Sequence, residues 1–191
     1  STYGEFINKF NEFQNAALGL ESVSKFKGID SNAALRTVKE LDNVKSGLLS
    51  IGDASTSLKN LLSANFSLQQ SVDVLNRFSD AAAFGRQGSL SFGEAVRSAT
   101  EGIKNGNSIL VDNCGVTKNL SVMLTEAGYS AQDMQNAATD AGVRMTIFNG
   151  IMRETNGQVG DAAKLMDTSQ GAAVAYEKSI NDLKISFGAL L

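Results

Sequence analysis

Cys114 is the side chain with the most distinctive chemistry, because it is the only thiol among 191 residues. A cysteine becomes a nucleophile when a neighbouring base or cation stabilises its thiolate. The surrounding stretch, Leu110-Val-Asp-Asn-Cys-Gly-Val116, supplies no His or Lys for that purpose. A free cysteine without such a neighbour usually behaves as a small apolar residue. We therefore predict that Cys114 is buried or half-buried and chemically inert.

The absence of His limits the chemistry further. The sequence lacks the commonest general base and the commonest zinc ligand, since it contains no His. A single Cys can form neither an internal disulfide nor a Cys-based metal site. We accordingly expect no catalytic, metal-binding or cofactor-binding residues, no cofactor, and no enzymatic activity.

Carboxylates and glycines give weaker chemical signals. Asp80 and Glu101 fall in amphipathic patterns, where acidic side chains usually lie on the solvated face. The stretch Gly102-Ile-Lys-Asn-Gly-Asn-Ser108 superficially resembles a phosphate-binding loop. Its glycine spacing is short by one residue, however, and no Lys follows Gly106 to reach a phosphate. A Ser–Lys catalytic pair stays open, because both residue types are frequent in the sequence.

Composition and charge argue against several other classes. The formal net charge is −3 and the basic residues are mostly scattered singly, whereas a nucleic-acid surface needs clustered Lys and Arg. We therefore expect no specific nucleic-acid partner. No apolar run approaches the roughly 18 residues of a membrane span. The apolar share of 42% is too high for a disordered chain.

Helices are the elements that must position these residues. The sequence contains no Pro, and Ser67 with Gln70 and Ser91 with Glu94 have the spacing of helix-starting capping boxes. Glycines follow most of the apolar helical patterns, as they do at helix ends. We predict an all-α fold, a Gly-punctuated bundle of roughly seven to nine helices with more than about 60% helix. Within it we expect one helix over 31–49, a short extended segment over 109–116 and a helix over 130–141.

The first and last helices carry heptad-like apolar seams. Their apolar residues alternate in spacings of three and four, which is typical of helices that associate along their length. The first seam consists of Phe6, Phe10, Phe13, Ala17 and Leu20, and the last consists of Ala173, Tyr176, Ile180, Leu183, Phe187 and Leu190. Both seams are predicted to mediate helix–helix association and homo-oligomerisation. The alternative is that both are buried within one monomeric bundle.

The middle of the chain has a recurring order of turns and helices. A small-residue helix from Ser91 leads into the turn Gly106-Asn107-Ser108, followed by Leu110 and then by Gly115-Val116. Further on come Tyr129-Ser-Ala-Gln-Asp133, Phe148-Asn-Gly-Ile151 and Val159-Gly-Asp-Ala-Ala163. This order resembles an internal segment of the tape measure proteins of long-tailed, siphovirus-type phages and prophages, over about residues 30–191.

The resemblance implies a structural role in the virion. Tape measure proteins set tail length during assembly, contact tail tube and tail-tip proteins, are bound by tail assembly chaperones, and leave before the genome is delivered. It implies a location in the tail tube lumen or tail tip, and in the host cytoplasm during assembly. We expect one domain of a longer protein, with an N-terminal amphipathic helix over 1–28, a helical bundle over 29–165 and a heptad helix over 166–191 that continues further.

Two other functions remain as alternatives. A helical binding or effector module that recognises a host protein would be favoured by one large exposed apolar patch. A peptidoglycan hydrolase is a third candidate, since some tape measure proteins carry such domains, but the missing His disfavours it.

Overall fold

Helices make up most of the part of the chain that the structure describes. The computed structural model describes residues 2–190, except for the side chains of Phe187 and Leu190. Helices make up 77% of the chain and residues 2–190 contain no strand, which confirms the all-α prediction. The α-helices are α1 (Thr2–Phe26), α2 (Ser31–Glu40), α3 (Asp42–Lys45), α4 (Ile51–Ser63), α5 (Leu68–Gly85), α6 (Phe92–Asn105), α7 (Ser108–Asp112), α8 (Leu120–Glu126), α9 (Ala141–Glu154), α10 (Asp161–Met166) and α11 (Ser169–Leu190). Two 3₁₀ helices, η1 (Ala131–Gln135) and η2 (Asn156–Gln158), complete the set within this range.

Helix starts and stops follow local chemistry. The Ser67 and Ser91 hydroxyls accept hydrogen bonds from the backbone N–H groups of Gln70 and Glu94, whose side chains accept in return from the serine N–H groups. These reciprocal bonds satisfy donors that the first helical turn leaves free. Gly106 ends α6 with φ at 65°, a left-handed conformation that glycine adopts without a steric penalty.

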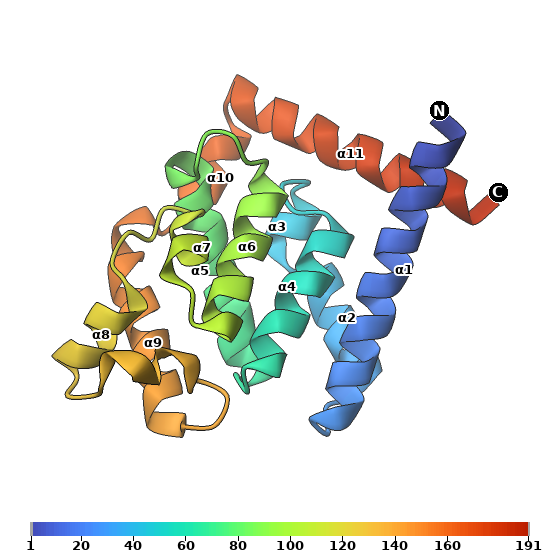
Figure 1. Cartoon of the computed structure of the whole chain (residues 1–191). Coiled ribbons are helices and arrows are strands. Elements are labelled where there is room, and N and C mark those ends of the chain that lie inside the picture. Colours follow the sequence, from blue (N-terminus) through green and yellow to red (C-terminus); the bar gives the residue numbers. More distant parts are fainter. Residues whose placement is uncertain (1, 191) are drawn as a thin grey trace.

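The core lies between α4, α5 and α6, at the centre of Figure 1. Leu58, Phe78 and Ile103 come one from each of these helices and are fully buried. Alanines such as Ala54 and Ala99 are also fully buried, so that α4 and α6 approach closely. Burial of such side chains is the main favourable contribution to folding, about 25 cal/mol for each Å² of apolar surface.

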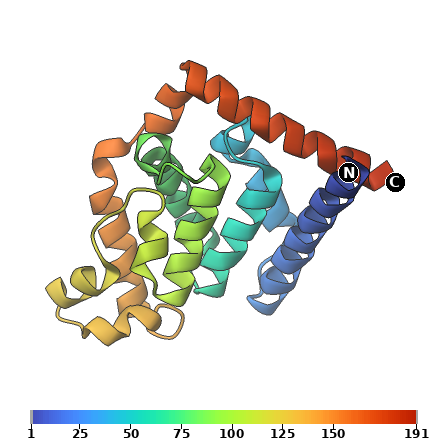
Figure 2. The ribbon, with the colours of Figure 1, turned by 45° about the horizontal axis from the view of Figure 1, so that its top comes forward.

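The remaining helices surround this core. Helix α1 packs on α4, whereas α9 and α10 pack on α5. Helix α11 leaves α10 on one side of the molecule and crosses one end of it to reach α1 on the other side (Figures 1 and 2). Consequently the two terminal helices pack against each other. Among residues 2–190, no helix has the length and apolar character that a membrane span requires.

Three predicted boundaries were wrong. The helix expected over 31–49 breaks at Leu41, whose extended backbone places its own side chain in the core. The segment expected to be extended over 109–116 begins as α7, because the Asn107 side chain caps this helix. The helix expected over 130–141 is only the short η1 followed by turns. The described range also contains more helices than the roughly seven to nine expected, because short helices such as α3 and α10 connect the longer ones.

Candidate functional site

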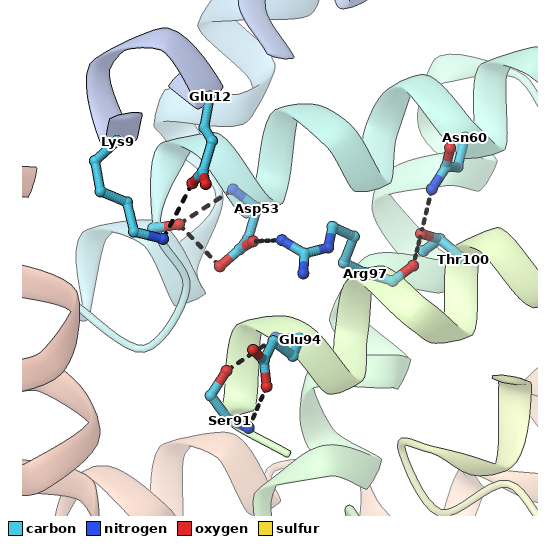
Figure 3. Close-up of polar contacts among 9 residues, drawn as sticks. Lys9, Glu12, Asp53, Asn60, Ser91, Glu94, Arg97 and Thr100 are labelled. Carbon is cyan, nitrogen blue, oxygen red and sulfur yellow. Dashed lines mark hydrogen bonds and ion pairs between the residues drawn. The ribbon is translucent and has the colours of Figure 1, made fainter. Parts of the chain in front are cut away.

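A cleft lined by several charged side chains lies where α1 and α11 meet α4 and α6. Its volume is about 380 Å³. The charged side chains that line it are Lys9, Glu12, Asp53, Lys59 and Arg97. Figure 3 shows two pairs among them: Lys9 with Glu12, both on α1, and Arg97 on α6 with Asp53 on α4.

Asp53 is at the centre of this network. Arg97 Nη1 on α6 donates to Asp53 Oδ1 at 2.7 Å. The Ser50 hydroxyl donates to Asp53 Oδ2 and accepts from the Asp53 backbone N–H, both at 3.1 Å, which caps the start of α4. Both carboxylate oxygens of Asp53 are therefore engaged, Oδ1 by the Arg97 guanidinium and Oδ2 by the Ser50 hydroxyl. The arrangement therefore joins α4 to α6 more readily than it activates a hydroxyl.

A second polar contact lies further along the same two helices. Asn60 Nδ2 on α4 donates to the Thr100 hydroxyl on α6 at 3.2 Å, and that hydroxyl donates to the Arg97 backbone carbonyl at 2.8 Å (Figure 3). All three groups come from buried or half-buried positions. Asn60 and Thr100 thus satisfy each other inside the α4–α6 interface, which favours a single register of the two helices.

Comparison with known proteins gives no match: no family model, no curated protein and no solved structure is similar to this chain. The functional interpretation therefore depends on where the structure places the predicted residues.

Cys114 is completely buried, as predicted. Burial raises the pKa of its thiol to about 12, and the nearby charge of Asp112 adds to this effect. The thiol donates to the Val111 carbonyl at 3.3 Å. At neutral pH the group is therefore a protonated thiol inside the core, and its nucleophilic form is not populated.

The turn motif of the middle segment organises packing. Asn107 Oδ1 accepts from the Ile109 N–H at 3.1 Å, and Ser108 Oγ accepts from the Leu120 N–H at 2.8 Å, which connects the starts of α7 and α8. Gly106 is buried so closely that an added Cβ would lie 2.7 Å from the Met134 carbonyl oxygen.

The rest of the motif also serves the fold. Leu110 is half-buried, Val116 belongs to the core, and the Gly115 backbone lies against that of Gly85 at the end of α5. The residues of this turn motif thus contribute to the packing of α5, α6, α7 and α8.

The two heptad-like seams lie in different environments. Leu20 is buried, and Phe6, Phe10 and Phe13 are half-buried on the inner side of α1. On α11, by contrast, most of the seam residues with described side chains face solvent. Tyr176 is 69% exposed and Leu183 is 47% exposed, while Ile180 is half-buried. The side chains of Phe187 and Leu190 lie outside the described residues.

The pairing of Asp53 with Arg97 was not predicted from the sequence. The two residues are 44 positions apart, and no local pattern connects them. Only the start of α4 carried a signal, since Ser50 and Asp53 have the spacing of a helix cap. Among the described residues, no group of three or more His, Cys, Asp or Glu side chains could hold a metal ion.

Proposed function

We propose that the chain is a compact structural module of a tape measure protein from a long-tailed phage or prophage. Its sequence resemblance to that family over about residues 30–191 supports the proposal. The structural role of the resembling residues also supports the proposal, because Gly106, Asn107 and Ser108 form the junction between α6 and α7. In this proposal the module acts in tail assembly and genome delivery, in the tail tube lumen or at the tail tip. Its partners are tail tube and tail-tip proteins, assembly chaperones and further copies of itself.

The observation that carries the proposal is the meeting of the two terminal helices. Gly188 on α11 lies directly on α1, where an added Cβ would contact the Phe10 side chain and lie 2.6 Å from the Phe6 carbonyl oxygen. Lys184 Nζ also pairs with the Glu5 carboxylate at 3.2 Å. Residues near both ends of the fold are therefore neighbours in space (Figures 1 and 2).

This closure decides how the module would contribute to a molecular ruler. One continuous helix of 191 residues would span roughly 290 Å, because each residue adds 1.5 Å. In the observed fold, the first and last helices pack against each other, so the polypeptide enters and leaves the module at nearly the same place. We infer that the module adds bulk and contact surface to a tape measure protein and adds almost nothing to its length.

The experiment is an in-frame deletion of residues 7–187 in the phage gene that encodes the chain, followed by electron microscopy of the tails. The deletion joins Phe6 to Gly188, which already lie together, so the flanking protein is disturbed little. We expect tails of unchanged length with reduced assembly yield or infectivity. If residues 7–187 instead formed an extended helix that measures tail length, their deletion would shorten the tails by about 270 Å.

The control is an equal deletion in a long helical stretch of the same gene outside these 191 residues, which should shorten the tail by that amount. Normal yield, length and infectivity after the deletion of 7–187 would refute a role for this module in the tail. Shortened tails would refute the compact-module form of the proposal while supporting the tape measure assignment.

A further inference from the structure

Helix α11 presents its apolar side to solvent. Ala173, Tyr176, Ile180 and Leu183, which we call the α11 stripe, follow heptad spacing on one side of the helix. Tyr176 and Leu183 are well exposed, Ala173 is exposed and Ile180 is half-buried. A helix that packs on a core normally turns such a stripe inward. In Figure 2, α11 runs along an edge of the molecule, so one of its sides faces away from the other helices.

The inner side of α11 is the more polar one. Val174, Lys178, Asn181 and Ile185 point toward the rest of the chain, and all four are half-buried. Lys178 lines a small cavity beneath the middle of the helix, and Asn181 lines both that cavity and the larger cleft described above. The closest approach comes later, where Gly188 lies on α1. The helix is therefore held by its inner side and by the contact at Gly188, while the exposed members of its apolar stripe, Ala173, Tyr176 and Leu183, face solvent.

We propose that the α11 stripe binds the same stripe of a second copy of this chain, with the two α11 helices antiparallel. A two-fold axis makes such a contact self-complementary. The charges beside the stripe favour this direction. When Ile180 packs against Leu183 of the second copy, Glu177 lies beside Lys184 of that copy, and the symmetry repeats the pair.

The parallel arrangement lacks this complementarity. It would place Lys184 beside Ser179 of the second copy and Glu177 beside Ala172, so that neither charge finds an opposite partner. Lys184 already pairs with Glu5 of its own chain, but an ammonium group has three donors and can bind a second carboxylate. Charge complementarity therefore selects a second copy in antiparallel orientation as the occupant.

One helix pair buries less surface than the roughly 1,600 Å² of a standard protein interface, so we expect a weak dimer. The inference rests on the self-association included in the proposed function, and it is tested on the purified 191-residue chain. Sedimentation velocity over a concentration series up to about 1 mM, where binding near −4 kcal/mol becomes visible, should show a monomer–dimer equilibrium. Circular dichroism checks that every variant keeps its helices.

Two sets of variants make the test specific. Leu183→Glu should abolish the dimer, whereas Leu18→Glu, at an equally exposed position on α1 outside the stripe, should leave it intact. Glu177→Lys should weaken dimerisation about tenfold, because two attractive pairs become repulsive. Adding Lys184→Glu to that variant, together with Glu5→Lys to keep the ion pair between α11 and α1, should restore dimerisation.

A folded chain that stays monomeric at every concentration would overturn the inference, as would a dimer that is insensitive to Leu183→Glu. Binding of a host or tail protein to the stripe of a strictly monomeric chain would also overturn it. None of these results changes the expected outcome of the tail-length experiment, so failure here is distinguishable from failure of the proposed function.

Discussion

Replacing Gly188 with Ala tests the contact between the terminal helices. The new methyl group would lie 2.6 Å from the Phe6 carbonyl oxygen, a backbone atom that moves only if α1 and α11 separate. Overpacking of this kind costs about 1–3 kcal/mol. The higher helix propensity of Ala offsets up to about 1 kcal/mol. We therefore expect the free energy of unfolding to fall by about 1–2 kcal/mol, since the two effects oppose each other.

Urea denaturation measures this change, and hydrogen exchange locates it. Exchange should accelerate in α11 and in the first half of α1, while α4, α5 and α6 keep their protection. Gly52→Ala is the matched control, because Gly52 also lies in a helix and its added Cβ has open space apart from one contact at 4.0 Å. That variant should be more stable by about 0.4–1 kcal/mol. If Gly188→Ala were equally stabilising and α11 stayed protected, the close packing of the terminal helices would be refuted.

The remaining predictions concern the core, a cap and the thiol. Phe78→Ala should lower the free energy of unfolding by about 3–5 kcal/mol in urea denaturation, because Phe78 is fully buried; a loss below about 1 kcal/mol would contradict its place in the core. Ser91→Ala should cost about 1 kcal/mol through loss of the α6 cap, with Ser186→Ala on exposed α11 as a control. Burial raises the pKa of the Cys114 thiol from 9.0 to about 12, so the folded state holds this proton more tightly than the unfolded state. Its contribution to stability is complete below pH 9 and is lost as pH rises toward 12. Wild type should therefore lose stability over this range more steeply than Cys114→Ala, and equal slopes would argue against a buried thiol.

Local chemistry made much of the helix order predictable. The capping boxes at Ser67 and Ser91 and the stop at Gly106 depend on residues within a few positions of each other, and all were confirmed. The break at Leu41 was not predictable in this way. Leu41 continues the helical apolar pattern of α2, yet its backbone turns so that Leu48 also reaches the core. The direction of the backbone at Leu41 depends on where α4 and α5 lie in the fold. Residues close to Leu41 in the sequence do not determine those positions.

The two heptad-like seams show the same limit more clearly. Phe10 and Tyr176 both belong to apolar repeats with spacings of three and four, but Phe10 lies at the α1–α11 contact and Tyr176 faces solvent. Spacing predicts that a helix has an apolar side, and only the tertiary fold decides whether that side is covered. The Asp53–Arg97 pair was unpredictable for a related reason, because the packing of α6 on α4 brings the two residues together.

The most direct test of the compact module is a distance between its two ends in the purified chain. Spin labels attached through cysteines at the exposed positions Tyr3 and Ser186, in a Cys114→Ala background, report the separation of α1 and α11 by pulsed electron paramagnetic resonance. Packed helices have axes about 8–10 Å apart, so the structure predicts a single short distance. A long or broad distribution, as expected if the segment opens toward an extended helix of roughly 270 Å, would contradict the closed fold on which the proposed function depends.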